Sequence, residues 1–145
     1  MTAEAAIDLE TLARFFEEGI PFNKALGIRV ERLIPGRALI RVPYKETLIG
    51  NPMLPALHGG VISSLADAAG GLAVWSTLDA RCSLSTIDLR VDYLRPGRPL
   101  DLYCSAEVVR SGNRVGVSAM SIFHEDEARP VADARGVYNI KRPSD

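Results

Sequence analysis

The residues best suited to chemistry lie in one stretch, where His58, Gly59 and Gly60 are followed by a lone aspartate, Asp67. Residues 60–77 are otherwise apolar or small and contain no proline, which predicts a helix buried around most of its circumference. The leading N–H groups of such a helix have no intrahelical partner. With the positive end of the helix dipole, they form a site for an anion or a polarised carbonyl oxygen.

A helical wheel places Asp67 among the smallest side chains of this helix. Its stripe contains Gly60, Ser63, Ser64, Asp67, Gly70, Gly71 and Val74. A glycine inside a helix costs roughly 1 kcal/mol relative to alanine, so these glycines predict the close approach of another backbone or a ligand. Two interpretations of Asp67 stay open. It is a group in a site, or it is a carboxylate that faces solvent or accepts a hydrogen bond from a partner helix.

The composition is typical of a globular protein, and its 145 residues fit a single domain over residues 1–145. With a formal net charge of −1, neither nucleic acid nor a membrane is expected as a partner. No run approaches the roughly 20 apolar residues that span a bilayer. The acidic N-terminus does not resemble a secretory signal, so we expect a cytoplasmic location.

Metal, redox and serine-triad sites are not expected. Cys82 and Cys104 are isolated, and the two histidines, His58 and His124, are too few for a zinc site. We therefore expect both cysteines in or near the core, and His124, beside two acidic residues, at the surface. The chain has no GxSxG motif and few histidines for a Ser-His-Asp triad.

The first half of the chain supplies a helix and two strands ahead of the central helix. Residues 7–18 have the spacing of a short amphipathic helix, and residues 21–26 are predicted to be a connector with Phe22 pointing inward. Period-two alternation over residues 27–44, interrupted by a Pro-Gly pair, predicts two antiparallel strands. Residues 45–57 are predicted to be a loop.

The second half predicts four strands, of which residues 85–94 give the clearest signal. In this strand Ile87, Leu89, Val91 and Tyr93 would face one side, and Thr86, Asp88, Arg90 and Asp92 the other. Further strands are expected at residues 100–110, 115–124 and 131–140. They would complete a four-stranded meander, followed by a frayed tail over residues 141–145.

This order of elements favours an α+β fold, in which a six-stranded antiparallel sheet has its helices on one face. One helix cannot cover both faces of such a sheet. An edge or a face is therefore left for a second subunit.

The string HGGVISSLADAAGG, with Asn51 upstream and STIDLRVDYLRPGRP downstream, closely resembles the PaaI-like branch of the hotdog-fold acyl-CoA thioesterases. The resemblance covers roughly residues 27–140. It implies a sheet wrapped around the long central helix, and a homodimer that assembles into a homotetramer. It also implies hydrolysis of a small-molecule acyl-CoA substrate with no further cofactor and no metal.

By position, the resemblance implies that the Gly59 N–H faces the thioester carbonyl oxygen and that Asp67 is the catalytic carboxylate. Asn51 would lie near the thioester or the attacking water, and Thr86 would hold that water. The implied substrate-binding residues are His58, Gly60, Ser64, Ser85, Arg90 and Arg95. Candidates for the coenzyme A phosphates, which suit guanidinium groups, also include Arg98, Arg110 and Arg114.

Thioester hydrolysis also fits these residues on chemical grounds, since it needs a donor for the oxyanion and a base or nucleophile. Asp67 can attack the carbonyl carbon directly or deprotonate a water, and the sequence leaves both open. Gly59 and Asp67 lie about 12 Å apart along a helix, so one chain is poorly placed to bring both to one carbonyl. The resemblance implies a site shared across a dimer interface.

Two other functions stay open. The first is a hotdog hydratase or dehydratase that uses the His58 region, although the chain lacks the proline-glycine helix entry of those enzymes. The second is an acyl-CoA-binding protein without catalytic activity.

Overall fold

The computed structural model describes residues 5–144. Its helical elements are α1 (Leu9–Arg14), the π-helical turn η1 (Phe15–Gly19), α2 (Pro21–Leu26), the 3-10 turn η2 (Glu46–Leu48) and α3 (Gly59–Trp75). Its strands are β1 (Arg29–Ile34), β2 (Arg37–Val42), β3 (Ile49–Asn51), β4 (Ala56–Leu57), β5 (Ser83–Tyr93), β6 (Leu102–Ser111), β7 (Val115–Phe123) and β8 (Ala132–Lys141). No helix in the described range has the length and apolar character needed to cross a membrane.

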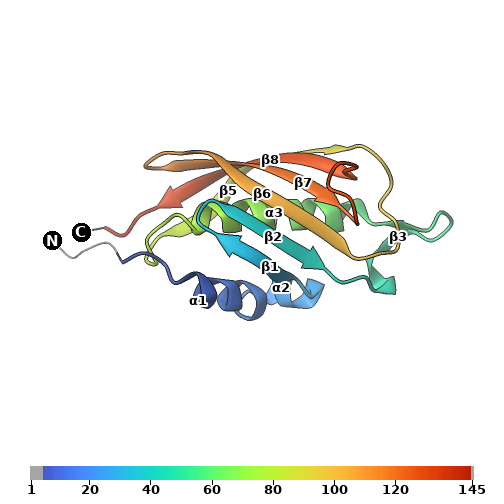
Figure 1. Ribbon diagram of the computed structural model, residues 1–145, viewed down its shortest axis with the longest axis horizontal. Helices are drawn as coiled ribbons and strands as arrows, with labels where there is room; N and C mark the ends of the chain where they lie inside the picture. The colour runs from blue at the N-terminus through green and yellow to red at the C-terminus, as the bar shows by residue number, and fades with distance from the viewer. Residues whose placement is uncertain (1–4, 145) are drawn as a thin grey trace.

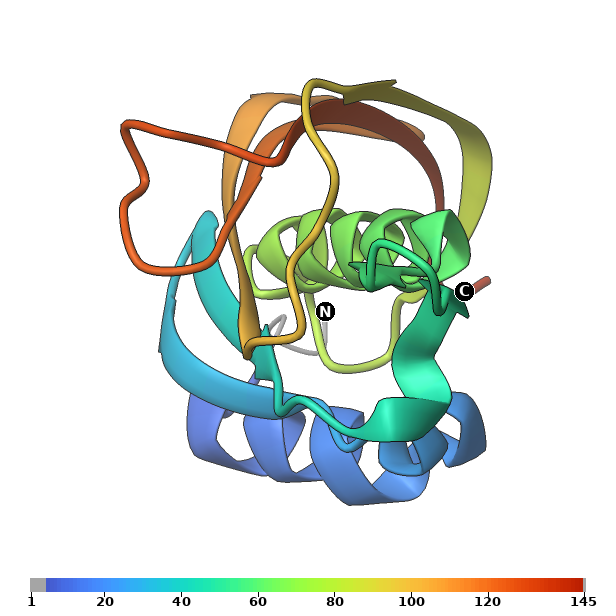
Figure 2. The ribbon, with the colours of Figure 1, turned by 90° about the vertical axis from the view of Figure 1, so that its right-hand side faces the viewer.

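Six strands form one antiparallel sheet in the order β1-β2-β6-β7-β8-β5, and this sheet curves around α3 (Figures 1 and 2). The N-terminal helices lie along the side that the curved sheet leaves open (Figure 2). The predicted α+β hotdog fold, with its long central helix and short N-terminal helix, is confirmed.

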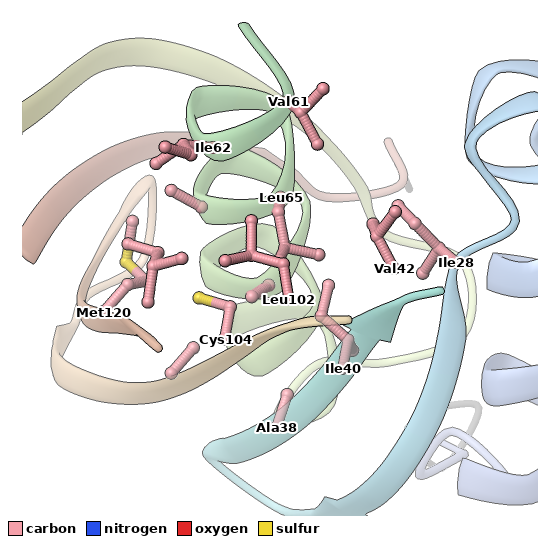
Figure 3. Packing of buried hydrophobic residues seen from close by; sticks show 14 of the residues in the cluster. Ile28, Ala38, Ile40, Val42, Val61, Ile62, Leu65, Leu102, Cys104 and Met120 are labelled. Atoms are coloured by element: carbon pink, nitrogen blue, oxygen red, sulfur yellow. The ribbon is translucent and has the colours of Figure 1, made fainter. Parts of the chain in front are cut away.

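The core lies between α3 and the concave face of the sheet. Figure 3 shows Leu65 of α3 beside Leu102 of β6, with Ile40 and Val42 of β2 to one side, whereas Ile62 lies on the side of Met120. Cys82 and Cys104 are both buried, as predicted. Burial raises the pKa of the Cys104 thiol far above its usual value, so this thiol is an inert core group.

The predicted four-stranded meander is wrong, because β5 does not neighbour β6. Strand β5 pairs with β8, and β6 pairs with β2. The chain runs through α3 between β2 and β5, which carries β5 to the far edge of the sheet. Alternation of side chains specifies the two faces of a strand but not its neighbours. Within the described chain, the outer edge of β5 is unpaired.

A β-bulge in β5 also changes which face Thr86 occupies. Thr86 and Asp88 pair with consecutive residues of β8, so Ile87 is an extra residue, and its side chain is 57% exposed. Thr86 therefore faces α3 on the same side as Leu89, whereas strict alternation placed the two on opposite sides.

The predicted connector over residues 21–26 is the helix α2. Pro21 suits its first turn, because proline has no N–H to leave unpaired there. Gly27 ends it in the left-handed conformation, with φ of 76°. Phe22 is 58% exposed rather than inward, and the inward position is taken by Asn23, whose amide donates to the Phe16 carbonyl at 3.1 Å.

Three smaller predictions also differ from the structure. The predicted loop over residues 45–57 contains η2, β3 and β4. Lys141 belongs to β8, and Arg142 Nε donates to the Asn113 carbonyl at 2.9 Å, so this part of the tail is bound; Asp145 lies outside the described residues. His124 is buried, not at the surface: its Nε2 accepts from the Arg98 N–H at 3.0 Å, and its Nδ1 lies 2.8 Å from the Asp101 carbonyl.

Candidate active site

The start of α3 leaves one backbone donor free. His58 is the N-cap, and its Nδ1 accepts a hydrogen bond from the Gly60 N–H at 2.8 Å. The Gly59 N–H has no hydrogen-bond partner within the described part of the chain. Helix starts favour a polarised or negative oxygen. Gly59 therefore offers such an oxygen a donor, whereas the Gly60 N–H is already bonded.

Gly59 lies in a pocket of about 370 Å³ that Tyr93 and Arg95 also line. The Tyr93 hydroxyl donates to the Gly59 carbonyl at 3.2 Å. This contact ties the end of β5 to the first residue of α3, and so positions the free N–H relative to the strand.

Asp67 is half-buried, and two elements of the sheet hold it. The Thr86 hydroxyl donates to its Oδ1 at 2.8 Å, and the Tyr138 phenol donates to its backbone carbonyl at 3.0 Å. Burial, and then the negative charge of Asp67, raise the pKa of the Tyr138 phenol well above its usual value, so this group stays protonated and donates. The carboxylate thus has a fixed orientation on a strand contact, not on a partner helix.

Four of the predicted site residues share one pocket of about 230 Å³: Ser64, Asp67, Ser85 and Thr86. The rest of its lining is mostly apolar, with Asn23 and the Tyr138 hydroxyl the other polar groups. A carboxylate beside an apolar pocket is an arrangement typical of an enzyme site for a substrate with a polar centre and an apolar group.

The structure separates Asp67 and its pocket neighbours from the Gly59 end of α3. Gly59 and Asp67 line different pockets, and the helix rise between them is about 12 Å. Asn51 is exposed at the end of β3, where its Oδ1 accepts from the Met53 N–H at 3.0 Å. It contacts neither Asp67 nor Thr86 through a hydrogen bond.

The arginine candidates are dispersed. Arg90 is exposed and pairs with Asp92 at 3.4 Å. Arg110 and Arg114 flank the β6–β7 turn, and the neighbouring Gly116 packs against Val74 near the last turn of α3. Only Arg95 and Arg98 therefore remain candidates at the Gly59 end of the helix.

Tyr138 was missed by the sequence prediction, although the glycines carried a signal for it. A Cβ on Gly70 would lie 2.3 Å from the Tyr138 hydroxyl oxygen, and a Cβ on Gly136 would lie 2.4 Å from it. The close neighbour of Gly70 is thus a side chain of the sheet, rather than the backbone or ligand that was predicted.

Known proteins resemble this chain over nearly its whole length. The protein family described as 'Thioesterase superfamily' matches residues 54–131. A Salmonella typhimurium protein named medium/long-chain acyl-CoA thioesterase YigI is 37% identical over 97% of both chains. A putative esterase of Halobacterium salinarum is 37% identical over 98% of this chain and 99% of its own.

The solved structures agree. A Shewanella oneidensis protein related to the thioesterase superfamily has a TM-score of 0.81 and 33% identity, covering 92% of this chain and 95% of its own. Among residues 5–144 no group of His, Cys, Asp or Glu side chains could hold a metal ion.

The fold, the sequence match and the relatives lead to one conclusion: this chain belongs to the thioesterase superfamily of hotdog-fold thioester hydrolases.

Proposed function

We propose that the protein hydrolyses an acyl-CoA thioester to the free acid and coenzyme A. The observation that carries this proposal is the half-buried Asp67 carboxylate, oriented by Thr86 at 2.8 Å in a mainly apolar pocket. The name of the Salmonella typhimurium relative, a medium/long-chain acyl-CoA thioesterase, supports the substrate class. Membership of the PaaI-like branch and a cytoplasmic location stay predictions from the sequence.

The chemistry follows from two groups. Asp67 removes a proton from a water held beside Thr86, and the hydroxide attacks the thioester carbonyl carbon. The carbonyl oxygen becomes negative and accepts a hydrogen bond from the Gly59 N–H. Collapse of this intermediate breaks the carbon–sulfur bond, and the coenzyme A thiolate takes the proton from Asp67. Direct attack by Asp67, with water then hydrolysing the anhydride, uses the same two groups.

The proposal includes a site shared by two copies of the chain. Since the helix rise between Gly59 and Asp67 is about 12 Å, one thioester carbonyl meets both only if they come from different protomers. The unpaired edge of β5 supports this, because that strand carries both Thr86 and Tyr93, and Tyr93 is 53% exposed. Two-fold pairing of such edges is a common way to form a dimer, and a homotetramer of such dimers stays a prediction.

Coenzyme A would lie on the Gly59 side of the shared site. A polar pocket of about 470 Å³ there is lined by Arg95, Arg98 and Arg129, together with the acidic Glu125 and Asp126. Arg95 also lines the pocket of Gly59, so the two pockets adjoin. Guanidinium groups suit the phosphates of coenzyme A. His58 and Gly60 at the same helix start, and Asn51 at the end of β3, are proposed to position the substrate.

Substitution of Asp67 tests the proposal. In Asp67→Asn the base or nucleophile is lost, and we expect release of free thiol from acyl-CoA to fall by at least about a hundredfold. The matched control is Asp133→Asn, which removes an exposed carboxylate of β8 and should leave the rate unchanged. Full activity of Asp67→Asn, with the fold intact by circular dichroism, would exclude the assigned role.

A further inference from the structure

The pocket beside Asp67 continues along α3. Its lining residues from that helix are Ser64, Asp67, Ala68, Gly71, Leu72 and Trp75. They recur every three or four positions, so the pocket follows one helix face for about 16 Å. Further lining residues come from η1 (Phe16), from α2 (Phe22 and Asn23) and from Ile20 between these two elements.

Trp75 lines this pocket at the end of α3 that lies away from Ser64. It is the last residue of α3 and, with Leu84, packs against a second hydrophobic cluster. That cluster consists of Val74, Leu78, Cys82, Tyr138 and Ile140. The ring of Phe15 meets Trp75 in an edge-on contact, with centroids 6.0 Å apart and planes at 88°. These contacts hold the Trp75 side chain in place at this end of the pocket.

We infer that Trp75 sets the upper limit on acyl-chain length. This inference rests on the proposed function, which places the thioester at Asp67. The acyl group then runs along α3 toward Trp75, away from the polar groups. From Asp67 to Trp75 the helix rises about 12 Å, and an extended chain of roughly eight carbons spans most of that distance.

The side chain of Trp75 suits a substitution experiment. Its indole Nε1 is buried and has no hydrogen-bond partner among residues 5–144. Trp75→Leu and Trp75→Phe therefore remove ring volume without breaking a hydrogen bond. Ala68 offers the opposite change, because it is half-buried and lines the same pocket next to Asp67. Ala68→Leu reduces the pocket volume that Trp75→Leu enlarges.

The test measures affinity for S-alkyl-coenzyme A thioethers from butyl to hexadecyl by calorimetry. Each methylene that enters an apolar pocket raises affinity about fourfold, so wild-type affinity should rise with length up to about octyl and then level off. In Trp75→Leu the rise should continue to decyl, in Trp75→Phe it should extend less far, and in Ala68→Leu it should stop before octyl. Val109→Ala, an exposed residue of β6 outside this pocket, should match wild type.

The thioethers cannot be hydrolysed, so this result is independent of catalysis. Suppose that the length at which affinity levels off shifts as expected in a protein that releases no thiol from acyl-CoA. That result would overturn the proposed function and keep the inference. If affinity levels off at the same chain length in wild type, Trp75→Leu and Ala68→Leu, the inference is overturned. Wild-type affinity that does not depend on chain length would also overturn it. If Trp75→Leu does not fold, Trp75→Phe and Ala68→Leu decide the matter.

Discussion

At the scale of single residues, the site is defined by which hydrogen-bonding groups are already bonded within the chain and which remain available to a substrate. His58 occupies the Gly60 N–H, and Thr86 occupies one oxygen of Asp67, while the Gly59 N–H has no partner in the described chain. Arg95 is a similar case. It is exposed and has no ion-pair partner among residues 5–144, whereas Arg98 pairs with Glu125 at 4.0 Å.

We predict that Arg95→Gln raises KM for acyl-CoA about tenfold. A hydrogen bond to a charged group contributes about 1.5–3 kcal/mol, and the exposure of Arg95 favours the lower end. The comparison substrate is the corresponding acyl-pantetheine, which lacks the nucleotide phosphates and should show an unchanged KM. An equal rise for both substrates would mean that Arg95 acts on the fold rather than on phosphate.

At the scale of elements, the contact between α3 and β8 positions Asp67. Tyr138 of β8 reaches into the space left by Gly70 and Gly136 and donates to the Asp67 carbonyl at 3.0 Å. The helix therefore approaches the sheet closely at the turn that carries the carboxylate. Neighbouring Gly71 is less confined, because a Cβ there would lie 3.4 Å from the Tyr138 ring.

We predict opposite effects for two adjacent alanine substitutions. Gly70→Ala places a methyl group 2.3 Å from the Tyr138 hydroxyl oxygen, and overpacking of this kind lowers the free energy of unfolding by about 1–3 kcal/mol. Gly71→Ala meets only ordinary contacts and should raise it by up to about 1 kcal/mol, through helix propensity. Urea unfolding measures both. A stabilised Gly70→Ala variant would contradict the packing described above.

At the scale of the whole molecule, the proposed site needs two copies of the chain. The free edge of β5 and the separation of Gly59 from Asp67 along α3 are both features of a single protomer. They support a symmetric dimer in which each copy contributes the helix start to one site and the carboxylate to the other. Light scattering should then show a dimer or a larger assembly.

A mixed dimer tests the shared site directly. Gly59→Pro removes the N–H at the first helical position, where proline fits, and His58 already has the extended conformation that precedes proline. We expect kcat of the Gly59→Pro variant, measured by itself, to fall about a hundredfold or more. Gly59→Ala, which keeps the N–H, should stay active. Refolding Gly59→Pro with Asp67→Asn should restore about a quarter of wild-type activity, because half of the dimers are mixed and each has one intact site.

The opposite outcome is equally clear. If each site used Gly59 and Asp67 of the same chain, both sites of a mixed dimer would be defective. The mixture would then be no more active than its components, and the shared site would be wrong.

The sequence alone determined the types of the main elements and the position of the candidate site. Period-two alternation over residues 27–44 and 85–94, together with turn signals between the later strands, identified the six main strands. An apolar stretch with one aspartate identified α3. These patterns depend on neighbours two to four positions apart, and local backbone geometry is enough to impose them. The HGG string and Asp67 similarly placed the donor and the carboxylate on one helix.

Only the tertiary structure decided which elements are neighbours and which way particular side chains face. It brought β5 to β8, turned Thr86 toward Asp67 through the bulge at Ile87, and left Phe22 exposed. Each of these depends on contacts between distant parts of the chain, such as the bond between Tyr138 and Asp67, which lie 71 positions apart. Such contacts follow from the path of the chain around α3, which no local pattern of side chains encodes.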